Sequence, residues 1–186
     1  MRATPTLWFC PILRLMATSN AWRDSALARR YNAASMIAGL FFHILAAVIW
    51  VGGMFFAHQM LRPAVAALEP AQRLGLWRRV FARFFPWVWA SIAALLASGY
   101  GMVIWGYGGF AHIGLHIHVM QGIGIVMMLA FAHLYFSPWR RFRAAVDGGD
   151  LPAAAQLLTQ IRRIVTFNLV LGLIVVVVGA TGRYWA

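Results

Sequence analysis

Histidine is the main ionisable side chain inside the long apolar segments of this sequence. His43 and His58 lie fifteen residues apart in the first segment, and His118 and His133 lie fifteen apart in the third. Fifteen residues of helix rise about 22 Å and return to nearly the same face. If the two helices run in the same direction, His43 meets His118 at one level and His58 meets His133 at another. Two such pairs would suit bis-histidine ligation of one or two haem b groups, with His116 as an alternative to His118.

A second group of potential ligands lies at the start of the third apolar segment. His112, His116 and His118 form an HxxxHxH pattern, and Met120 follows two residues later. Imidazole and thioether groups are ligands of copper, and thioethers favour Cu(I). A copper site built from these four residues, with help from His43 and nearby methionines, is therefore the alternative to haem.

The composition excludes several other kinds of chemistry. Of the 186 residues, 62% are hydrophobic and 11% are charged, which excludes an ordinary soluble enzyme. No Asp or Glu lies in the apolar segments, so paired-carboxylate catalysis is not expected there. All sixteen basic residues are arginine, so lysine Schiff-base chemistry is absent. Cys10 is the single cysteine and cannot form an intrachain disulfide or a cysteine-based zinc site.

The elements that must position these residues are four membrane helices. About 20 apolar residues span a bilayer as a helix, and four segments are long enough: 36–61, 84–107, 115–137 and 164–182. We therefore predict an all-α membrane protein, a four-transmembrane-helix bundle, over residues 36–186. Residues 1–35 are predicted to form a weakly structured tail. Alternatively, they are upstream sequence included by a start codon assigned too early, since Met36 stands where the first apolar segment begins.

Arginine is concentrated in two of the three connections between the predicted spans. The first connection, 62–83, and the third, 138–163, carry five arginines each, and the middle one carries none. Positively charged loops favour the cytoplasm, so loops one and three are predicted to be cytoplasmic in a bacterial inner membrane. The net charge of +12 then reflects topology and contact with the lipid bilayer, not binding of nucleic acid. In the third connection, Asp150 is predicted to cap a short helix along the membrane surface.

Two stretches carry a family resemblance. The first-helix sequence HILAAVIWVGGMFF resembles the H-x-x-x-x-x-x-W-x-G-G signature of the CopD family, the copper-resistance D group of integral membrane proteins. The stretch HIHVMQGIGIVMMLAFAHLYFSPWRRF resembles the third-helix block of its short, stand-alone members. The resemblance covers about residues 36–186 and implies copper handling at the bacterial inner membrane.

The CopD family is itself distantly similar to the HemJ-type protoporphyrinogen oxidases, which bind haem b through histidine. In that comparison His43 corresponds to the first-helix histidine, and His133 falls where a later helix carries one. HemJ-type proteins also depend on a lysine, which this chain lacks. The resemblance therefore leaves haem binding open and argues against protoporphyrinogen oxidase activity, so whether the protein is a membrane oxidoreductase stays undecided.

Three functions follow from the sequence. The leading hypothesis is a haem b protein that transfers electrons across or within the membrane through the paired histidines, with a redox partner or a second copy of the chain as its partner. The alternative is a copper-binding or copper-transport protein for copper homeostasis. The third is an assembly or structural protein in which the histidines form only hydrogen bonds between helices.

Overall fold

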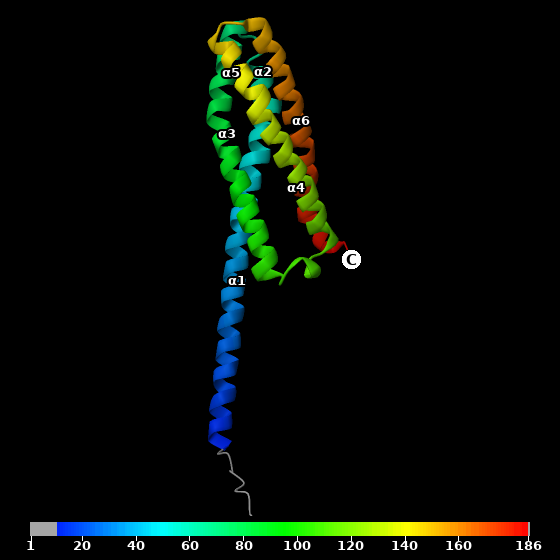
Figure 1. Cartoon of the computed structure of the whole chain (residues 1–186). Coiled ribbons are helices and arrows are strands. Elements are labelled where there is room, and N and C mark those ends of the chain that lie inside the picture. The colour runs from blue at the N-terminus through cyan, green and yellow to red at the C-terminus, as the bar shows by residue number, and fades with distance from the viewer. Residues whose placement is uncertain (1–10, 186) are drawn as a thin grey trace, which may run out of the picture.

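The chain folds into long helices. The computed structural model describes the backbone of residues 11–185 and the side chains of residues 33–182, 184 and 185. In this part of the chain every regular element is helical (Figure 1). Four helical segments are long and apolar enough to cross a membrane: Ala33–Ala64, Pro70–Gly106, Leu115–Asp147 and Leu151–Thr181. The predicted fold class is confirmed, and the protein is a multi-pass membrane protein.

The four spans are built from helices with short π-helical or 3₁₀ turns at their ends. The first comprises the part of α1 (Pro11–Phe56) that begins at Ala33, a π turn and α2 (Arg62–Ala64). The second comprises α3 (Pro70–Gly101) and a π turn. The third comprises α4 (Leu115–Leu134), a π turn and α5 (Arg140–Asp147), and the fourth is α6 (Leu151–Thr181). A 3₁₀ turn, Phe110–His112, precedes α4, and another, Gly182–Tyr184, follows α6.

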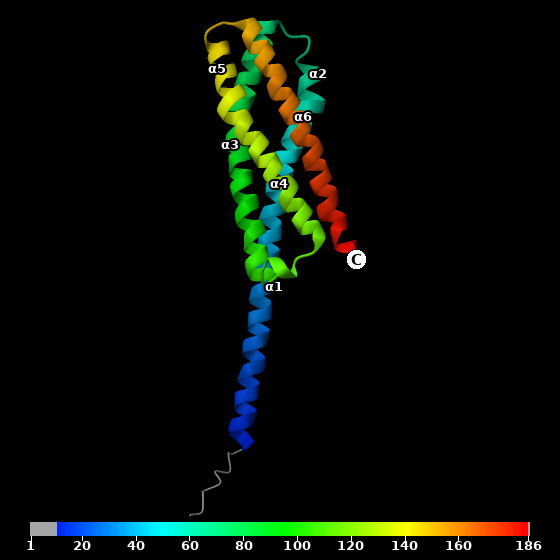
Figure 2. The same cartoon turned by 45° about the vertical axis from the view of Figure 1, so that its right-hand side comes forward.

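The bundle consists of two helix pairs. Helix α1 packs mainly against α3, α4 packs mainly against α6, and α6 also contacts α1. The connections from α2 to α3 and from α5 to α6 lie at the same end of the bundle (Figure 1 and Figure 2). We call this the arginine-rich end, because residues 62–83 and 138–163 lie there. The connection from α3 to α4 lies at the opposite end.

The helices reach further toward the arginine-rich end than the sequence predicts. The segments expected as loops, 62–83 and 138–163, are mostly helical: α3 begins at Pro70, and α5 and the first turns of α6 occupy most of the second segment. Frequent arginine lowers the mean hydropathy there, but one face of each helix is apolar and buried, as Trp77, Phe81 and Phe142 illustrate. Hydropathy alone therefore marks the apolar centre of a helix and misses its amphipathic extension.

The predicted surface helix after Asp150 is wrong in one respect. Asp150 does cap a helix, because its carboxylate accepts a hydrogen bond from the Ala153 backbone N–H at 3.0 Å. That helix is the start of α6 itself and packs into the bundle, with Ala154 and Leu158 buried. Gly149 makes the tight turn from α5 possible, since its φ of 75° is costly for residues with a side chain.

Residues 1–35, predicted as a weakly structured tail, are only partly covered by the structure. The helical backbone of α1 runs from Pro11 into the first span without a break. Residues 1–10 lie outside the described residues.

Aromatic side chains form the centre of the core. Phe85 stacks on Phe81, with ring centroids 5.1 Å apart, and meets Trp139 and Phe131 edge to face at 5.2 and 5.5 Å. Buried Asn168 ties the α4–α6 pair together by donating a hydrogen bond to the Met127 carbonyl at 3.0 Å. These contacts join α3, α4, the π turn that follows α4, and α6.

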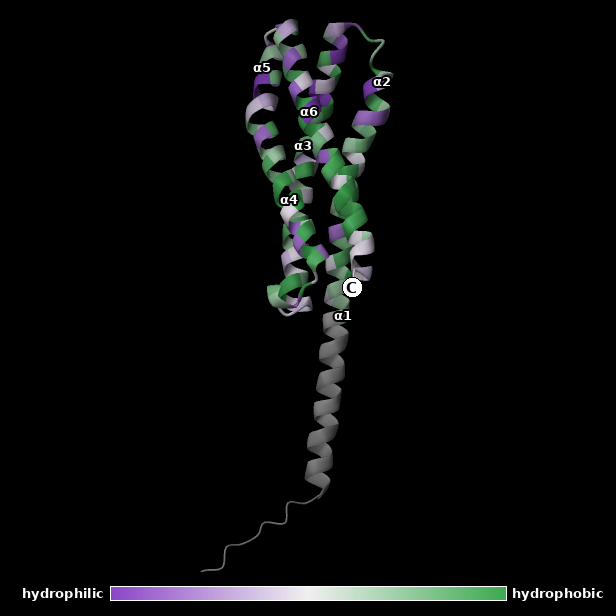
Figure 3. Ribbon diagram, turned by 90° about the vertical axis from the view of Figure 1, so that its right-hand side faces the viewer, coloured by the Kyte–Doolittle hydropathy of each residue, from purple (hydrophilic) through white to green (hydrophobic). Residues whose placement is uncertain are grey.

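The outer surface of the spans is apolar. Large side chains such as Phe41, Val48 and Val177 are about 60% exposed, as expected for residues that face lipid. Hydrophobic residues cover the middle of the bundle, and hydrophilic residues gather at the end that carries α2 and α5 (Figure 3). The surface therefore fits a bilayer around the middle of the four spans.

Candidate metal-binding residues

His43 is held in the interface between α1 and α3. Its Nδ1 atom lies 3.0 Å from the Ser98 hydroxyl, and that hydroxyl donates its own hydrogen to the Ala94 carbonyl in the preceding turn of α3. In the tautomer that matches this pattern, Nδ1 carries the proton and donates it to the Ser98 hydroxyl. The lone pair of a neutral imidazole is then on Nε2, where it can bind a metal.

Two methionines lie in the same interface as His43. Gly99, beside Ser98, is covered by the His43 ring: a Cβ atom there would lie 3.2 Å from Cε1. One turn before His43 on α1, the Met102 side chain lies against Gly39. At the end of the interface, the Met36 side chain lies against Gly106 and leaves no room for a Cβ atom there. One imidazole and two thioethers, those of His43, Met102 and Met36, therefore follow one another along the α1–α3 interface toward the end opposite the arginine-rich end.

His116 and Met120 face α6. The His116 side chain fills the space beside Gly182, and a Cβ at Gly179 would lie 3.2 Å from Cε and 3.5 Å from Sδ of Met120. These two of the four predicted copper ligands thus lie on one face of α4, one turn apart. The other two, His112 and His118, are exposed.

The remaining histidines differ in their surroundings. His58 is partly buried and lines a small cavity between the first span, α3 and α6. His133, on α4, is exposed. Its exposed position contrasts with that of the neighbouring buried Leu134.

The histidines proposed as haem ligands lie in different surroundings. His43 faces α3 while His118 is exposed on α4, and the cavity beside His58 is not lined by His133. Helices α1 and α4 are not among the extensively packed pairs, although Trp50 and Phe131 meet edge to face at 6.2 Å in the core. Bis-histidine ligation therefore stays a prediction from spacing.

Within the described residues, no three histidine, cysteine or acidic side chains form a cluster that could hold a metal ion. A metal site in this part of the chain would therefore need other donors, and thioether sulfur is the soft donor available in the two interfaces described above. Thioether and imidazole donors together favour Cu(I).

Met36, Met102 and Ser98 were not among the candidate residues from the sequence. One signal was present: Met36 and His43 are seven residues apart, and Ser98 and Met102 are four apart, so each pair occupies one helical face. The choice of α3 as the partner of that face depends on helix packing, which spacing within one helix does not specify.

The comparison with known proteins identifies the family. A family model described as "Copper resistance protein D" matches residues 78–181, from the first turns of α3 to the end of α6. This range includes the third-helix block that carries the sequence resemblance, whereas the first-helix signature lies before it. No curated protein and no solved structure matches the chain. Because the match covers more than half of the sequence, the chain belongs to the CopD family of membrane proteins.

Proposed function

We propose that the protein handles copper in a bacterial inner membrane, with Cu(I) as its cargo. The observation that carries the proposal is the placement of His43: its Nδ1 pairs with the Ser98 hydroxyl in an interface that also contains Met102 and Met36. Imidazole and thioether are suitable ligands for Cu(I). The family match to a copper resistance protein agrees with this cargo.

A second pair of donors supports entry or exit of copper at the opposite end. His116 and Met120 lie one turn apart on the face of α4 that packs against α6. The α1–α3 donors also lie toward that end, since Met36 covers Gly106 at the end of the second span. With loops one and three in the cytoplasm, as the arginine distribution favours, both donor groups belong to the external half of the membrane.

The experiment is a competition titration of the detergent-purified protein with a chromogenic Cu(I) chelator. We expect wild-type protein to remove Cu(I) from the chelator, and His43→Ala and Met102→Leu to weaken binding about ten-fold or more, since each removes one ligand. Met127→Leu is the control, because Met127 is a buried methionine in the core, away from His43. Unchanged affinity in both ligand variants would contradict the proposal.

Haem b is the second candidate, since the same Nε2 atom of His43 would suit haem iron. It is separated from copper by an absorption spectrum of the purified protein before and after reduction with dithionite. A Soret band with sharp reduced α and β bands favours haem and electron transfer. A colourless protein that binds Cu(I) favours copper handling.

A further inference from the structure

A groove opens between α4 and α6 on the outer surface of the bundle. Its volume is about 350 Å³, and it is lined only by apolar residues: Val119, Gly122, Ile123, Val126, Phe167 and Leu171. Gly122 leaves space for the groove, because a Cβ atom there would meet nothing within 4 Å. Phe167 and Val126 are 50% and 46% exposed, so the groove is open to the lipid around the spans.

The helix faces that form the groove continue toward the arginine-rich end and reach polar side chains there. On α4, His133 lies eleven residues after Gly122. Eleven residues are about three turns and about 16 Å of helix, so the two share a face. On α6, Arg163 lies one turn before Phe167. His133 and Arg163 are both exposed, so their hydrogen-bond donors are accessible from outside the bundle.

His133 and Arg163 lie at nearly the same level of the bundle. Helices α4 and α6 run in opposite directions, and the hydrogen bond from Asn168 to the Met127 carbonyl joins them (Figure 1). From that contact, Arg163 is five residues and His133 six residues toward the arginine-rich end, which is about 8 and 9 Å of helix. The two side chains therefore lie together beyond the same end of the groove.

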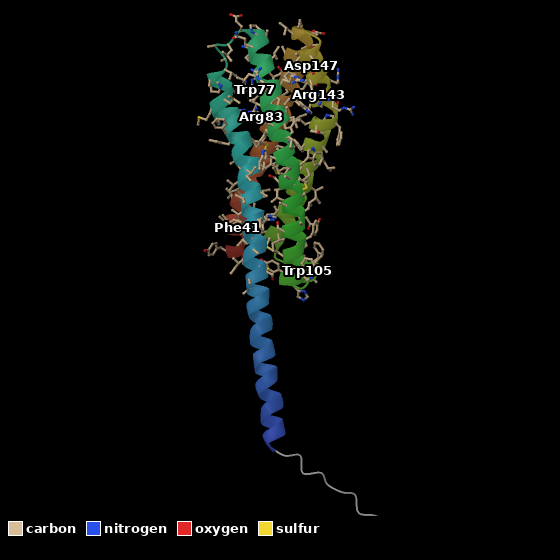
Figure 4. All side chains as sticks on the ribbon, turned by 90° about the vertical axis from the view of Figure 1, so that its left-hand side faces the viewer. Phe41, Trp77, Arg83, Trp105, Arg143 and Asp147 are labelled. Atoms are coloured by element: carbon tan, nitrogen blue, oxygen red, sulfur yellow. The ribbon has the colours of Figure 1, made fainter. Side chains whose placement is uncertain are left out.

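This level suits the phosphate groups of a bilayer. The apolar part of α6 begins directly after Arg163, and arginine is typical of the border between the apolar core and the headgroups. Arg83 and Arg143 also lie toward this end, whereas Trp105 lies at the other (Figure 4). In the part of the chain that the structure describes, the ion pair joins Arg78 to Asp147, so no carboxylate there neutralises Arg163.

We propose that the α4–α6 groove binds an anionic phospholipid. One acyl chain would lie in the groove along Gly122 and Phe167, and the phosphate would accept hydrogen bonds from Arg163 and His133. Basic sites between helices at the cytoplasmic face commonly bind lipid headgroups. A second copy of the chain fits less well, because twofold symmetry about the membrane normal would bring its own Arg163 to the same depth, and like charges repel. None of the donors proposed for copper takes part.

The test measures thermal unfolding of the full chain in an uncharged detergent with three added lipids. Dioleoylphosphatidylglycerol has the anionic headgroup. Dioleoylphosphatidylcholine keeps the phosphate and the acyl chains but has no net charge, and dioleoylglycerol keeps only the chains. Because a ligand that binds the folded state stabilises it, we expect the largest rise in melting temperature with phosphatidylglycerol.

Variants assign the effect to the groove. Gly122→Leu should abolish the rise because the new side chain fills the groove, whereas Gly52→Leu adds the same side chain at an exposed, open position of α1 and should keep it. Arg163→Gln should raise the phosphatidylglycerol concentration needed by about ten-fold or more, because a charge-assisted hydrogen bond is lost. Arg79→Gln removes the same charge from an exposed position of α3 and should have little effect.

Two results would overturn the proposal. One is a rise with phosphatidylglycerol that is no larger than with the other two lipids, or that each variant and its control reduce equally. The other is a dimer in lipid-free detergent, measured by light scattering, that Gly122→Leu dissociates, since the groove would then hold a second copy of the chain. These measurements are made without copper, so failure of the copper proposal would leave them unaffected.

Discussion

His43 on α1 and Ser98 on α3 are joined by a hydrogen bond of 3.0 Å between Nδ1 and Oγ. The Ser98 hydroxyl also donates to the Ala94 carbonyl, a pattern that matches the tautomer of His43 with Nε2 unprotonated. This one contact anchors α1 to α3, and in our proposal it also orients the imidazole for Cu(I). It is a role that buried partners of metal-binding histidines commonly play.

Ser98→Ala should therefore lower Cu(I) affinity without removing a ligand. Loss of an outer hydrogen bond to a ligating histidine typically weakens metal binding about 10–100-fold, and we expect the lower part of that range. The measurement is the chelator competition titration. Ser91→Ala is the control, since Ser91 is a buried serine two turns earlier on the same helix; an equal loss in both variants would show that the effect is one of general packing.

Gly172 lies at a close approach of three helices, α1, α4 and α6. A Cβ atom there would lie 2.8 Å from Val51 on α1 and 3.2 Å from Met127 on α4. Gly172→Ala should destabilise the bundle by about 1–3 kcal/mol, the usual cost of overpacking, measured by unfolding in mixed micelles. Gly122→Ala has no atom within 4 Å of its added methyl group and should be neutral or stabilising. The reverse order would contradict the packing described here.

Asn168 is the buried polar link between α6 and α4. Asn168→Ala should cost about 1–2 kcal/mol, because it removes the hydrogen bond to the Met127 carbonyl and some packing volume. Thr181→Ala is the comparison, since the Thr181 hydroxyl bonds the Val177 carbonyl of its own helix and lies exposed. If both substitutions had the same small effect on unfolding, Asn168 would not hold the two helices together.

Two aspartates near the α5–α6 turn should differ in their contribution to stability. Asp147 forms an ion pair with Arg78 at 2.7 Å, but the two side chains are 51% and 34% exposed, so Asp147→Ala should cost well under about 1 kcal/mol. Asp150→Ala removes the N-terminal cap of α6 and should cost about 1 kcal/mol. Thermal unfolding at low and high salt checks both, and only the Asp147 effect should weaken in salt.

The sequence predicts the four spans because each has a long segment without Asp, Glu or Arg. It misses the helical extensions at the arginine-rich end, where residues such as Trp77 and Phe142 are buried beside several arginines. Average hydropathy is low there, and only the helical period would reveal the buried face. The position of the Asp150 cap was predictable because a short polar side chain before Pro152 is a local signal.

The partners of the histidines could be predicted only in part. The spacing of His116 and Met120 correctly places them on one face of α4, and that face packs on α6. The pairing of His43 with His118 assumes that the first and third spans face each other, whereas the packing joins α1 to α3 and α4 to α6. Neighbours in the sequence tend to pack together, and that tendency would have directed attention to Ser98 and Met102.

The most direct test of copper handling is X-ray absorption spectroscopy of the protein loaded with one equivalent of Cu(I). We predict scattering from both nitrogen and sulfur in the first coordination shell, with the nitrogen lost in His43→Ala and the sulfur reduced in Met102→Leu. A first shell without sulfur, or one that neither substitution changes, would contradict a copper site in the α1–α3 interface.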